Sequence, residues 1–596
     1  MNIFSFDAIV IGTGAAGYNA ACRLKEMGKK VAIVTEGVNC GTSRNTGSDK
    51  QTYYKLGLGG DSPDSVRKMA ENLFAGGCVD GDNALCEAAL SVRSFMNLCE
   101  LGVAFPVNRY GEYVGYKTDH DPYARATSAG PLTSKFMTEA LQKKAAQLDI
   151  QIFDGLLAIQ VLKADNSVCG LLCIDMADGT PVAFRCGNVV MATGGPAGIY
   201  ADSVFPECHT GTTSLALSCG AKAQNLTMWQ YGLASTNPRW NVSGTYMQVL
   251  PRFVSIDKEG NEYEFLTDYL GDVYTALNLV FLKGYQWPFD PKKAENGSSQ
   301  IDMIVYNECV VKGRKVYLDF TKNPFGLDNI DYDKLSDEAR DYLVKAEATF
   351  GTPIERLAKM NTPAIELYSS KGVDITKEYL EIALCAQHNN GGIAVDMWWQ
   401  TAIRGLFAAG ECAGTHGISR PGGSALNAGQ VGSLRAALYI AQNPNQSVAE
   451  DEFEAIANNA ADLVVKCGEA EDNLEQLIMR AQRRMSDNAA AVRNKDKIKV
   501  ALDETTAQLV LIEKSVKPSR PERVFLYYKL KDILVTQAAV LTAMLNEDIS
   551  DTTKIQEVYL TDEGFVYEMR KVRPLPDSDD FFENIWRTYR ENKNVY

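Results

Sequence analysis

The chain has 596 residues, a length that predicts about four domain-sized units and enough material for a substantial core. Hydrophobic residues make up 45% and charged residues 23%, which excludes a wholly disordered or fibrous protein. The net charge of −15 argues against wrapping a nucleic-acid backbone, so no nucleic-acid partner is expected. The sequence contains neither a run of about 18 apolar residues nor a leader-like start. We therefore expect a cytoplasmic protein without a membrane span.

The cysteines and histidines give no metal-binding pattern. The 14 cysteines are scattered without a CxxC pair, and there are only four histidines. We therefore expect free thiols and no metal site in this chain.

The first motif lies close to the N-terminus. Residues 6–11 are nearly all apolar, as in a parallel strand buried on both faces, and run into a GxGxxG motif at 12–17. A helical pattern ending at Gly28 and a second apolar strand at 31–34 follow. The glycines permit a tight turn, close approach of a pyrophosphate, and packing of helix on strand, while Glu36 can accept hydrogen bonds from a ribose. The spacing predicts a dinucleotide site formed by Gly12, Gly14, Ala15, Ala16, Gly17 and Glu36.

Two later segments favour FAD over a nicotinamide cofactor. Residues 188–195 form an apolar strand that ends in an ATGG sequence, and residues 405–411 form another that ends in a glycine and an acid. Flavoproteins carry both elements, one returning the chain to the nucleotide domain and one placing an acid by the ribityl chain. The residues expected to contact FAD here are Ala192, Thr193, Gly194, Gly410 and Glu411.

Five further segments occur in the order found in one known family. They are the loop at 40–47, the segment at 210–221, the strand at 315–319, the turn at 387–393 and the run at 416–426. On these motifs the chain resembles the succinate dehydrogenase/fumarate reductase flavoprotein family, which also contains L-aspartate oxidase and the adenylylsulfate reductase alpha subunit. The resemblance covers most of the chain.

The resemblance implies an α/β fold with three parts. A discontinuous Rossmann-like FAD-binding domain is expected at 1–225 and 385–440, an inserted α+β capping domain at 226–384, and a C-terminal helical domain with a tail at 446–596. The resemblance also implies flavin contacts from the loop at 40–47 and from a helix that starts near 423. The residues concerned are Ser43, Asn45, Thr46, Gly47, Gly423, Ser424, Ala425 and Leu426. The tail is aromatic and is expected to dock on its own domain or on another subunit.

The departures from the family concern the substrate side. The flavin loop contains no histidine for covalent attachment, so FAD is expected to be non-covalent. The family's QFHPT histidine is replaced by Gly232, which is expected to make room for a substrate bulkier than fumarate. The loop that carries the catalytic arginine has no clear copy, and Arg252 is the nearest candidate.

We expect a retained flavin and a changed substrate. The predicted activity is hydride transfer between the flavin and a small anionic molecule other than fumarate, with Arg420 and His388 holding the anion and Arg252 closing over it. The alternative is adenylylsulfate reductase-like sulfur chemistry, with Asn45, Trp229, Arg252 and His388 around the flavin. A flavin-dependent RNA-modification protein is a third hypothesis, which the acidic charge disfavours. A separate iron–sulfur or other electron-transfer protein is expected as partner, and the oligomeric state is left open.

Overall fold

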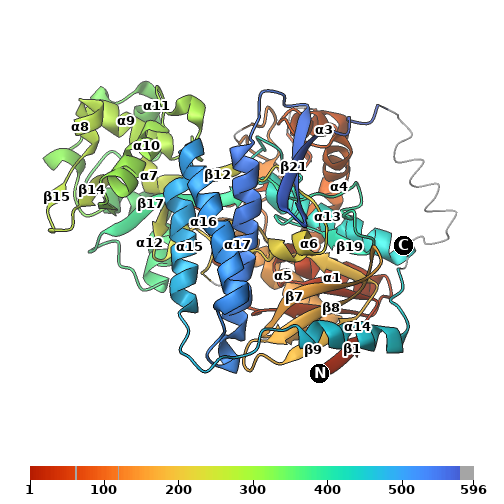
Figure 1. Cartoon of the computed structure of the whole chain (residues 1–596). Coiled ribbons are helices and arrows are strands. Elements are labelled where there is room, and N and C mark those ends of the chain that lie inside the picture. The colour runs from red at the N-terminus through yellow and green to blue at the C-terminus, as the bar shows by residue number, and fades with distance from the viewer. Residues whose placement is uncertain (61–62, 119, 208, 444, 578–596) are drawn as a thin grey trace.

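The computed structural model describes residues 1–60, 63–118, 120–207, 209–443 and 445–577, and its mixed α/β architecture confirms the predicted fold class. Figure 1 shows the nucleotide-binding part on the right, the cap on the upper left, and three long helices standing side by side between them. These are α15 (Leu474–Asn488), α16 (Lys495–Ser515) and α17 (Val524–Leu545). The aromatic tail residues Phe581, Phe582, Ile585, Trp586 and Tyr589 lie outside the described residues.

A five-stranded parallel sheet forms the centre of the nucleotide-binding part. Its order is β19 (Leu406–Ala408), β10 (Asn188–Met191), β2 (Ala8–Ile11), β3 (Val31–Thr35) and β6 (Gln151–Asp154). The chain moves from β2 toward β3 and β6, and later toward β10 and β19 on the other side. The strand order therefore reverses at β2, and open α/β sheets bind ligands at the carboxyl end of such a strand.

Helices and a second sheet cover this centre. β2 is buried along its whole length, as its apolar run predicts, and α1 (Ala15–Glu26) is the predicted helix after the glycine motif. α1 packs against α5 (Thr133–Gln147) and α13 (Ser424–Gln442), while α13 also packs against α4 (Gly81–Glu100). The second sheet has the order β1 (Asn2–Ser5), β9 (Pro181–Arg185), β8 (Ser167–Asp175) and β7 (Leu156–Ala164).

The cap is built on a six-stranded antiparallel sheet. Its order is β13 (Arg239–Asn241), β12 (Trp229–Thr236), β17 (Leu380–Asn389), β16 (Lys315–Asp319), β14 (Arg252–Ile256) and β15 (Glu262–Tyr263). The main cap helices are α9 (Val273–Lys283), α10 (Gln300–Tyr306), α11 (Asp337–Lys345) and α12 (Pro353–Ser370). The proposed boundary at residue 385 falls inside β17, so this strand is shared by the cap and the nucleotide-binding part.

The C-terminal region is not purely helical, which corrects the expectation for residues 446–596. After α14 (Glu450–Asp462) and the three long helices, the chain forms a hairpin of β20 (Lys554–Thr561) and β21 (Gly564–Lys571). β20 pairs with β11 (Ala223–Gln224), a strand of the nucleotide-binding part, which ties the two regions together. α17 is buried on nearly all sides. Within the described residues, no helix is both long and apolar enough to cross a bilayer.

Candidate functional site

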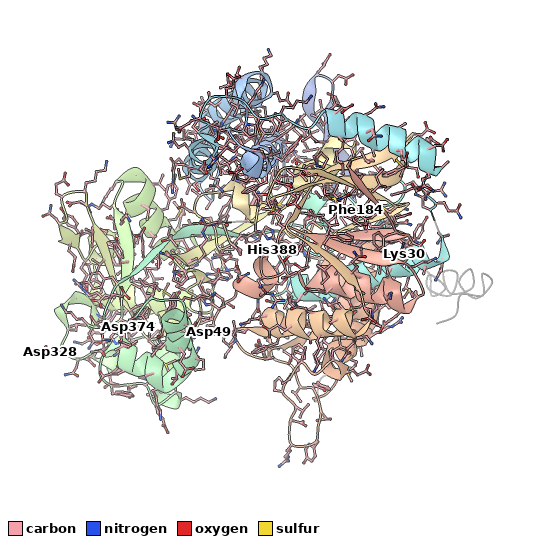
Figure 2. All side chains as sticks on the ribbon, turned by 90° about the horizontal axis from the view of Figure 1, so that it is seen from below. Lys30, Asp49, Phe184, Asp328, Asp374 and His388 are labelled. Atoms are coloured by element: carbon pink, nitrogen blue, oxygen red, sulfur yellow. The ribbon has the colours of Figure 1, made fainter. Side chains whose placement is uncertain are left out.

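A cavity of about 870 Å³ lies at the carboxyl end of β2 and extends from there to the cap. Most of the residues predicted to contact FAD meet along its wall, although they come from segments far apart in the sequence. The predicted residues that line the cavity are Gly12, Gly14, Ala15, Ala16, Glu36, Ser43, Thr46, Gly47, Ala192, Thr193, Gly194, Gly410, Glu411, Gly423, Ala425 and Leu426. Figure 2 shows His388 where the cap meets the nucleotide-binding part, with Asp49 beside the cap.

The glycine motif forms a turn that larger residues would obstruct. Gly12 has a φ of +106°, and a Cβ there would lie 2.5 Å from the carbonyl oxygen of Ala192. Gly17 does not line the cavity, but a Cβ there would lie 2.0 Å from the carbonyl oxygen of Gly12, so it permits close packing of α1 on the turn. α1 starts after Gly14 without a side-chain cap, and its first residues line the cavity. Such a helix start is suited to binding a pyrophosphate.

Glu36 lies at the nucleotide end of the cavity with a partner from a distant part of the chain. The Nζ atom of Lys529, from α17, lies 2.5 Å from its Oε2 atom. The C-terminal helical region therefore completes the wall on which the ribose of a dinucleotide is expected. No local signal in the sequence connects Lys529 with Glu36, because the two residues lie in segments that are far apart in the chain.

The flavin loop contains α2 (Thr42–Asn45), and one of its predicted contacts is wrong. The amide of Asn45 donates to the carbonyl oxygens of Asn39 and Gly41, at 2.8 and 3.0 Å, and does not line the cavity. The side chain of Asn45 therefore stabilises the conformation of the loop through hydrogen bonds within the loop. In contrast, the hydroxyl of Ser43 accepts from the backbone N–H of Ala15 at 3.4 Å, which joins the loop to α1.

His209 is a cavity residue that the motif pattern does not identify. Its Nε2 atom contacts the carbonyl oxygen of Gly195 at 3.1 Å, and its Nδ1 atom contacts the hydroxyl of Thr42 at 3.2 Å. Burial lowers the pKa of His209 to about 4, so the ring is neutral near pH 7. The one signal in the sequence that indicates it is its position directly before the motif at 210–221.

The start of α13 forms another wall. Gly423 precedes it with a φ of +88°, and the helix starts without a side-chain cap. Ala425 and Leu426 line the cavity, whereas the side chain of Ser424 is buried outside it. The positive end of a helix dipole at this place would stabilise negative charge on a bound ring system.

The predicted substrate residues Arg420 and His388 do meet in the structure. Both contact the Oδ1 atom of Asn390 at 3.1 Å, Arg420 through Nε and His388 through Nδ1. Arg420 also donates from Nη2 to the Oε1 atom of Gln230 at 2.7 Å. Both Arg420 and His388 line the cavity. His388 is carried there by the end of β17.

Two carboxyl groups near Arg420 are protonated near neutral pH. Burial raises the pKa of Glu411 to about 8 and the pKa of Glu87 to about 8. Burial also lowers the pKa of Arg420, to about 10, which leaves the guanidinium charged. Among the described residues, no carboxylate oxygen lies within 4.0 Å of the guanidinium nitrogens of Arg420. The charged guanidinium of Arg420 therefore forms no ion pair with a carboxylate among the described residues.

Arg252 is not part of this site, which corrects its assignment as a catalytic residue. Its guanidinium lies 3.2 Å from a carboxylate oxygen of Asp319, 2.6 Å from Glu262 and 3.3 Å from Glu264. Asp319 ends β16, Glu262 lies on the edge strand β15 and Glu264 follows it, and Arg252 does not line the cavity. Because three carboxylates pair with its guanidinium, Arg252 is not available to bind an anionic substrate.

The space expected at Gly232 is filled. A Cβ on Gly232 would lie 2.7 Å from the Nε1 atom of Trp287 and 2.7 Å from the Nε2 atom of Gln387. The indole of Trp287 thus takes the volume, and the expectation that this glycine enlarges the substrate site is wrong. Trp229 and Tyr231 do not line the cavity but face Tyr200, with the Tyr231 and Tyr200 hydroxyls 3.1 Å apart.

The comparisons with known proteins decide the family. A family model described as an FAD binding domain matches residues 7–426, more than half of the chain. The chain belongs to this FAD-binding family. A curated relative, a fumarate reductase (CoM/CoB) subunit of Methanothermobacter marburgensis, is 25% identical over 91% of each chain. Two solved structures share the fold, and both are less than 25% identical to this chain. They are Sdh1 of Mycobacterium smegmatis in complex with UQ1 (TM-score 0.75, 20% identity, 99% and 98% coverage) and adenylylsulfate reductase of Archaeoglobus fulgidus (TM-score 0.64, 15% identity, 96% of each chain).

This flavoprotein is an FAD-dependent oxidoreductase that is similar to a fumarate reductase subunit. The residues present fit the cofactor, because the glycine turn leaves space for a pyrophosphate and two uncapped helix starts face the cavity. Glu36 would hold the ribose, the starts of α1 and α13 would hold the phosphates and the ring, and Glu411 would stand beside the ribityl chain. Bound FAD supplies a group that accepts or donates hydride.

Proposed function

We propose that this oxidoreductase transfers hydride between FAD and a small anionic molecule other than fumarate, and that Arg420 holds the anion. The observation that carries this proposal is the unbalanced charge of Arg420 on the cavity wall. A guanidinium presents a planar fork of donors that matches a carboxylate. Because Arg420 uses Nε and Nη2 for neutral amide oxygens, an anion would meet a charge that no protein carboxylate has neutralised.

The cap supports a substrate with an apolar body. Phe281, Tyr285, Trp287 and Tyr342 line the cap side of the same cavity. The ring centroid of Phe281 lies 5.4 Å from that of Tyr342 and 6.2 Å from that of Tyr285, so these three side chains form one aromatic wall. Such a wall favours contact with an apolar group by burial of its surface. This wall, rather than the position of Gly232, supports a substrate bulkier than fumarate.

The adenylylsulfate-like alternative finds no support in the site. It required Asn45, Trp229, Arg252 and His388 around the flavin, and of these only His388 lines the cavity. The likeness to the adenylylsulfate reductase structure is at 15% identity and concerns the fold alone.

We further propose that FAD is bound non-covalently and that a separate electron-transfer protein exchanges electrons with it. The first proposal is supported by the flavin loop, which has no histidine between residues 40 and 47. The second is supported by the single GxGxxG motif, which leaves no second dinucleotide motif for a nicotinamide cofactor in this sequence.

The experiment compares Arg420→Met with the parent in titrations of the FAD-loaded protein, followed through the flavin absorbance. The probes are enoates, amino acids and adenylylsulfate, with flavin re-oxidation as the second readout. Losing a buried arginine that binds an anion costs on the order of 2–5 kcal/mol, so we expect about 10²-fold weaker binding of any anion that the parent binds. Lys117→Met, at the exposed rim of the cavity, is the control and should change binding by less than about twofold. Equal loss in both variants, or no loss in Arg420→Met, would refute the assignment.

A further inference from the structure

The cap end of the cavity contains a buried carboxyl group without a cationic partner. Asp49 lies just after the flavin loop at 40–47, is 5% exposed, and lines the cavity beside the cap (Figure 2). Its Oδ2 atom accepts a hydrogen bond from the backbone N–H of Thr245 in the cap at 2.6 Å. Within the part of the chain that the structure describes, Asp49 forms no ion pair, although the exposed Lys50 follows it in the sequence.

The structure keeps space for this carboxyl group and leaves one of its oxygens open. Gly244 has a φ of +61°, and a Cβ there would lie 2.1 Å from the Oδ2 atom of Asp49, so no larger residue fits beside the carboxyl group. The Oδ1 atom has no hydrogen-bond partner among the described residues and retains accessible surface on the cavity. Because a carboxylate removed from water without a donor is costly, this oxygen favours a ligand that brings a positive charge.

The aromatic wall of Phe281, Tyr285 and Tyr342 lies in the same region as Asp49. Tyr285 and Tyr342 are 37% and 38% exposed, so a ligand can reach their rings, whereas Phe281 is buried. Burial raises the pKa of Tyr342, and the negative charge of Asp49 raises it further, which places the carboxylate close to this hydroxyl. Aromatic rings attract cations, and together with a carboxylate they suit an organic ammonium group.

The charges along the cavity favour the same class of ligand. Among the described residues, those that line the cavity from the cap include no lysine, arginine or histidine, and Glu338 is the charged one. Its carboxylate accepts a hydrogen bond from the hydroxyl of Tyr285. The lysines and the arginine that line the cavity, Lys50, Lys117 and Arg420, come from the nucleotide-binding part. A positive group of a ligand would therefore meet acidic or uncharged side chains along the cap wall.

We propose that the cap end of the cavity binds an organic ammonium group between Asp49 and Tyr342. The Oδ1 atom of Asp49 pairs with the positive nitrogen, and the ring of Tyr342 contacts the carbon atoms bonded to it. With the anionic group held at Arg420, this assigns a substrate class: a molecule whose anionic group and ammonium group are separated by an apolar body. The ammonium site stands on the cap end alone, whereas the substrate class also rests on the proposed function for Arg420.

The first test measures the binding of matched acids to the FAD-loaded protein by titration calorimetry. The pairs are 6-aminohexanoate and heptanoate, 8-aminooctanoate and nonanoate, and 6-(trimethylammonio)hexanoate and 7,7-dimethyloctanoate, in which a positive nitrogen replaces an uncharged carbon. An apolar wall alone would bind the uncharged partner more tightly, because that partner buries more apolar surface. We expect the ammonium partner of at least one pair to bind about tenfold more tightly than its uncharged partner.

Matched variants test the two residues. Asp49→Asn removes the charge but keeps an oxygen that can accept from Thr245, and it should abolish the preference for the ammonium partner. Asp268→Asn changes the net charge by the same amount at an exposed position on α8 (Leu266–Leu270), and the preference should persist. Tyr342→Leu should weaken the preference within the trimethylammonio pair, whereas Tyr342→Phe keeps the ring and should retain it.

A cation without a carboxylate separates this inference from the proposed function. Benzyltrimethylammonium should bind Arg420→Met as tightly as the parent and Asp49→Asn about tenfold more weakly. Absence of an ammonium preference in every pair, or a preference that survives in Asp49→Asn, would overturn the inference, and loss of acid binding in Arg420→Met would still support the proposed function. Unchanged acid binding in Arg420→Met would overturn the proposed function and leave the ammonium site standing. If Asp49→Asn does not fold, equal effects of Tyr342→Leu and Tyr342→Phe would overturn the inference.

Discussion

Replacing Lys529 with methionine removes the cation that pairs with Glu36 while keeping the length of the side chain. The Nζ and Oε2 atoms are 2.5 Å apart, and the two side chains are 8% and 22% exposed. Breaking a fully buried pair costs about 3–5 kcal/mol and breaking an exposed pair about 0–1 kcal/mol, so we expect about 2 kcal/mol for this intermediate position. That free energy corresponds to about a 30-fold shift in the equilibrium between docked and undocked α17.

The assay is thermal unfolding of the FAD-free and FAD-loaded protein. We expect Lys529→Met to lower the Tm by a few degrees in both forms. Lys531→Met is the matched control on the same helix, because Lys531 pairs with Glu513 at 2.8 Å where both side chains are exposed, 38% and 53%. Its Tm should stay near that of the parent. The double variant Glu36→Gln with Lys529→Met removes both charges and should recover part of the loss. If Lys529→Met and Lys531→Met have the same Tm, the pair does not hold the C-terminal region to the nucleotide-binding part.

Two further predictions concern the cofactor and pH. Acid precipitation of the loaded protein should release all flavin to the supernatant, since the flavin loop has no histidine, and yellow colour in the pellet would contradict non-covalent binding. Burial raises the pKa of Glu87 to about 8, so between its ordinary value near 4.5 and about 8 the folded chain holds a proton that the unfolded chain has lost. The free energy of unfolding therefore falls as pH rises through that range, because the folded chain must keep a proton that the unfolded chain releases. Glu87→Gln removes the effect, and its Tm should rise relative to the parent between pH 5 and 8; a constant Tm difference would show that Glu87 is ionised when folded.

The sequence alone determined the features that depend on consecutive residues. The turn at Gly12 and the packing at Gly17 need glycine for local steric reasons, so the pattern of strand, glycines, helix and acid is enough to locate the dinucleotide site. The order of the later motifs indicates the family in the same way. The hairpin at 554–571 also has a local signal, an alternating pattern around a turn that ends at Gly564, although the helical periodicity of the preceding segments favours a helical domain there.

Only the tertiary structure decided which side chains meet. Arg252 has the residue type of a catalytic arginine, but strand pairing in the cap places three carboxylates around it. Gly232 offers space in the sequence, yet Trp287 fills that space from another segment. Glu36 forms an ion pair with Lys529, which lies in the C-terminal helical region of the chain. Charge balance, free volume and the position of a proton depend on neighbours that are distant in the sequence, and these neighbours become known only once the chain has folded.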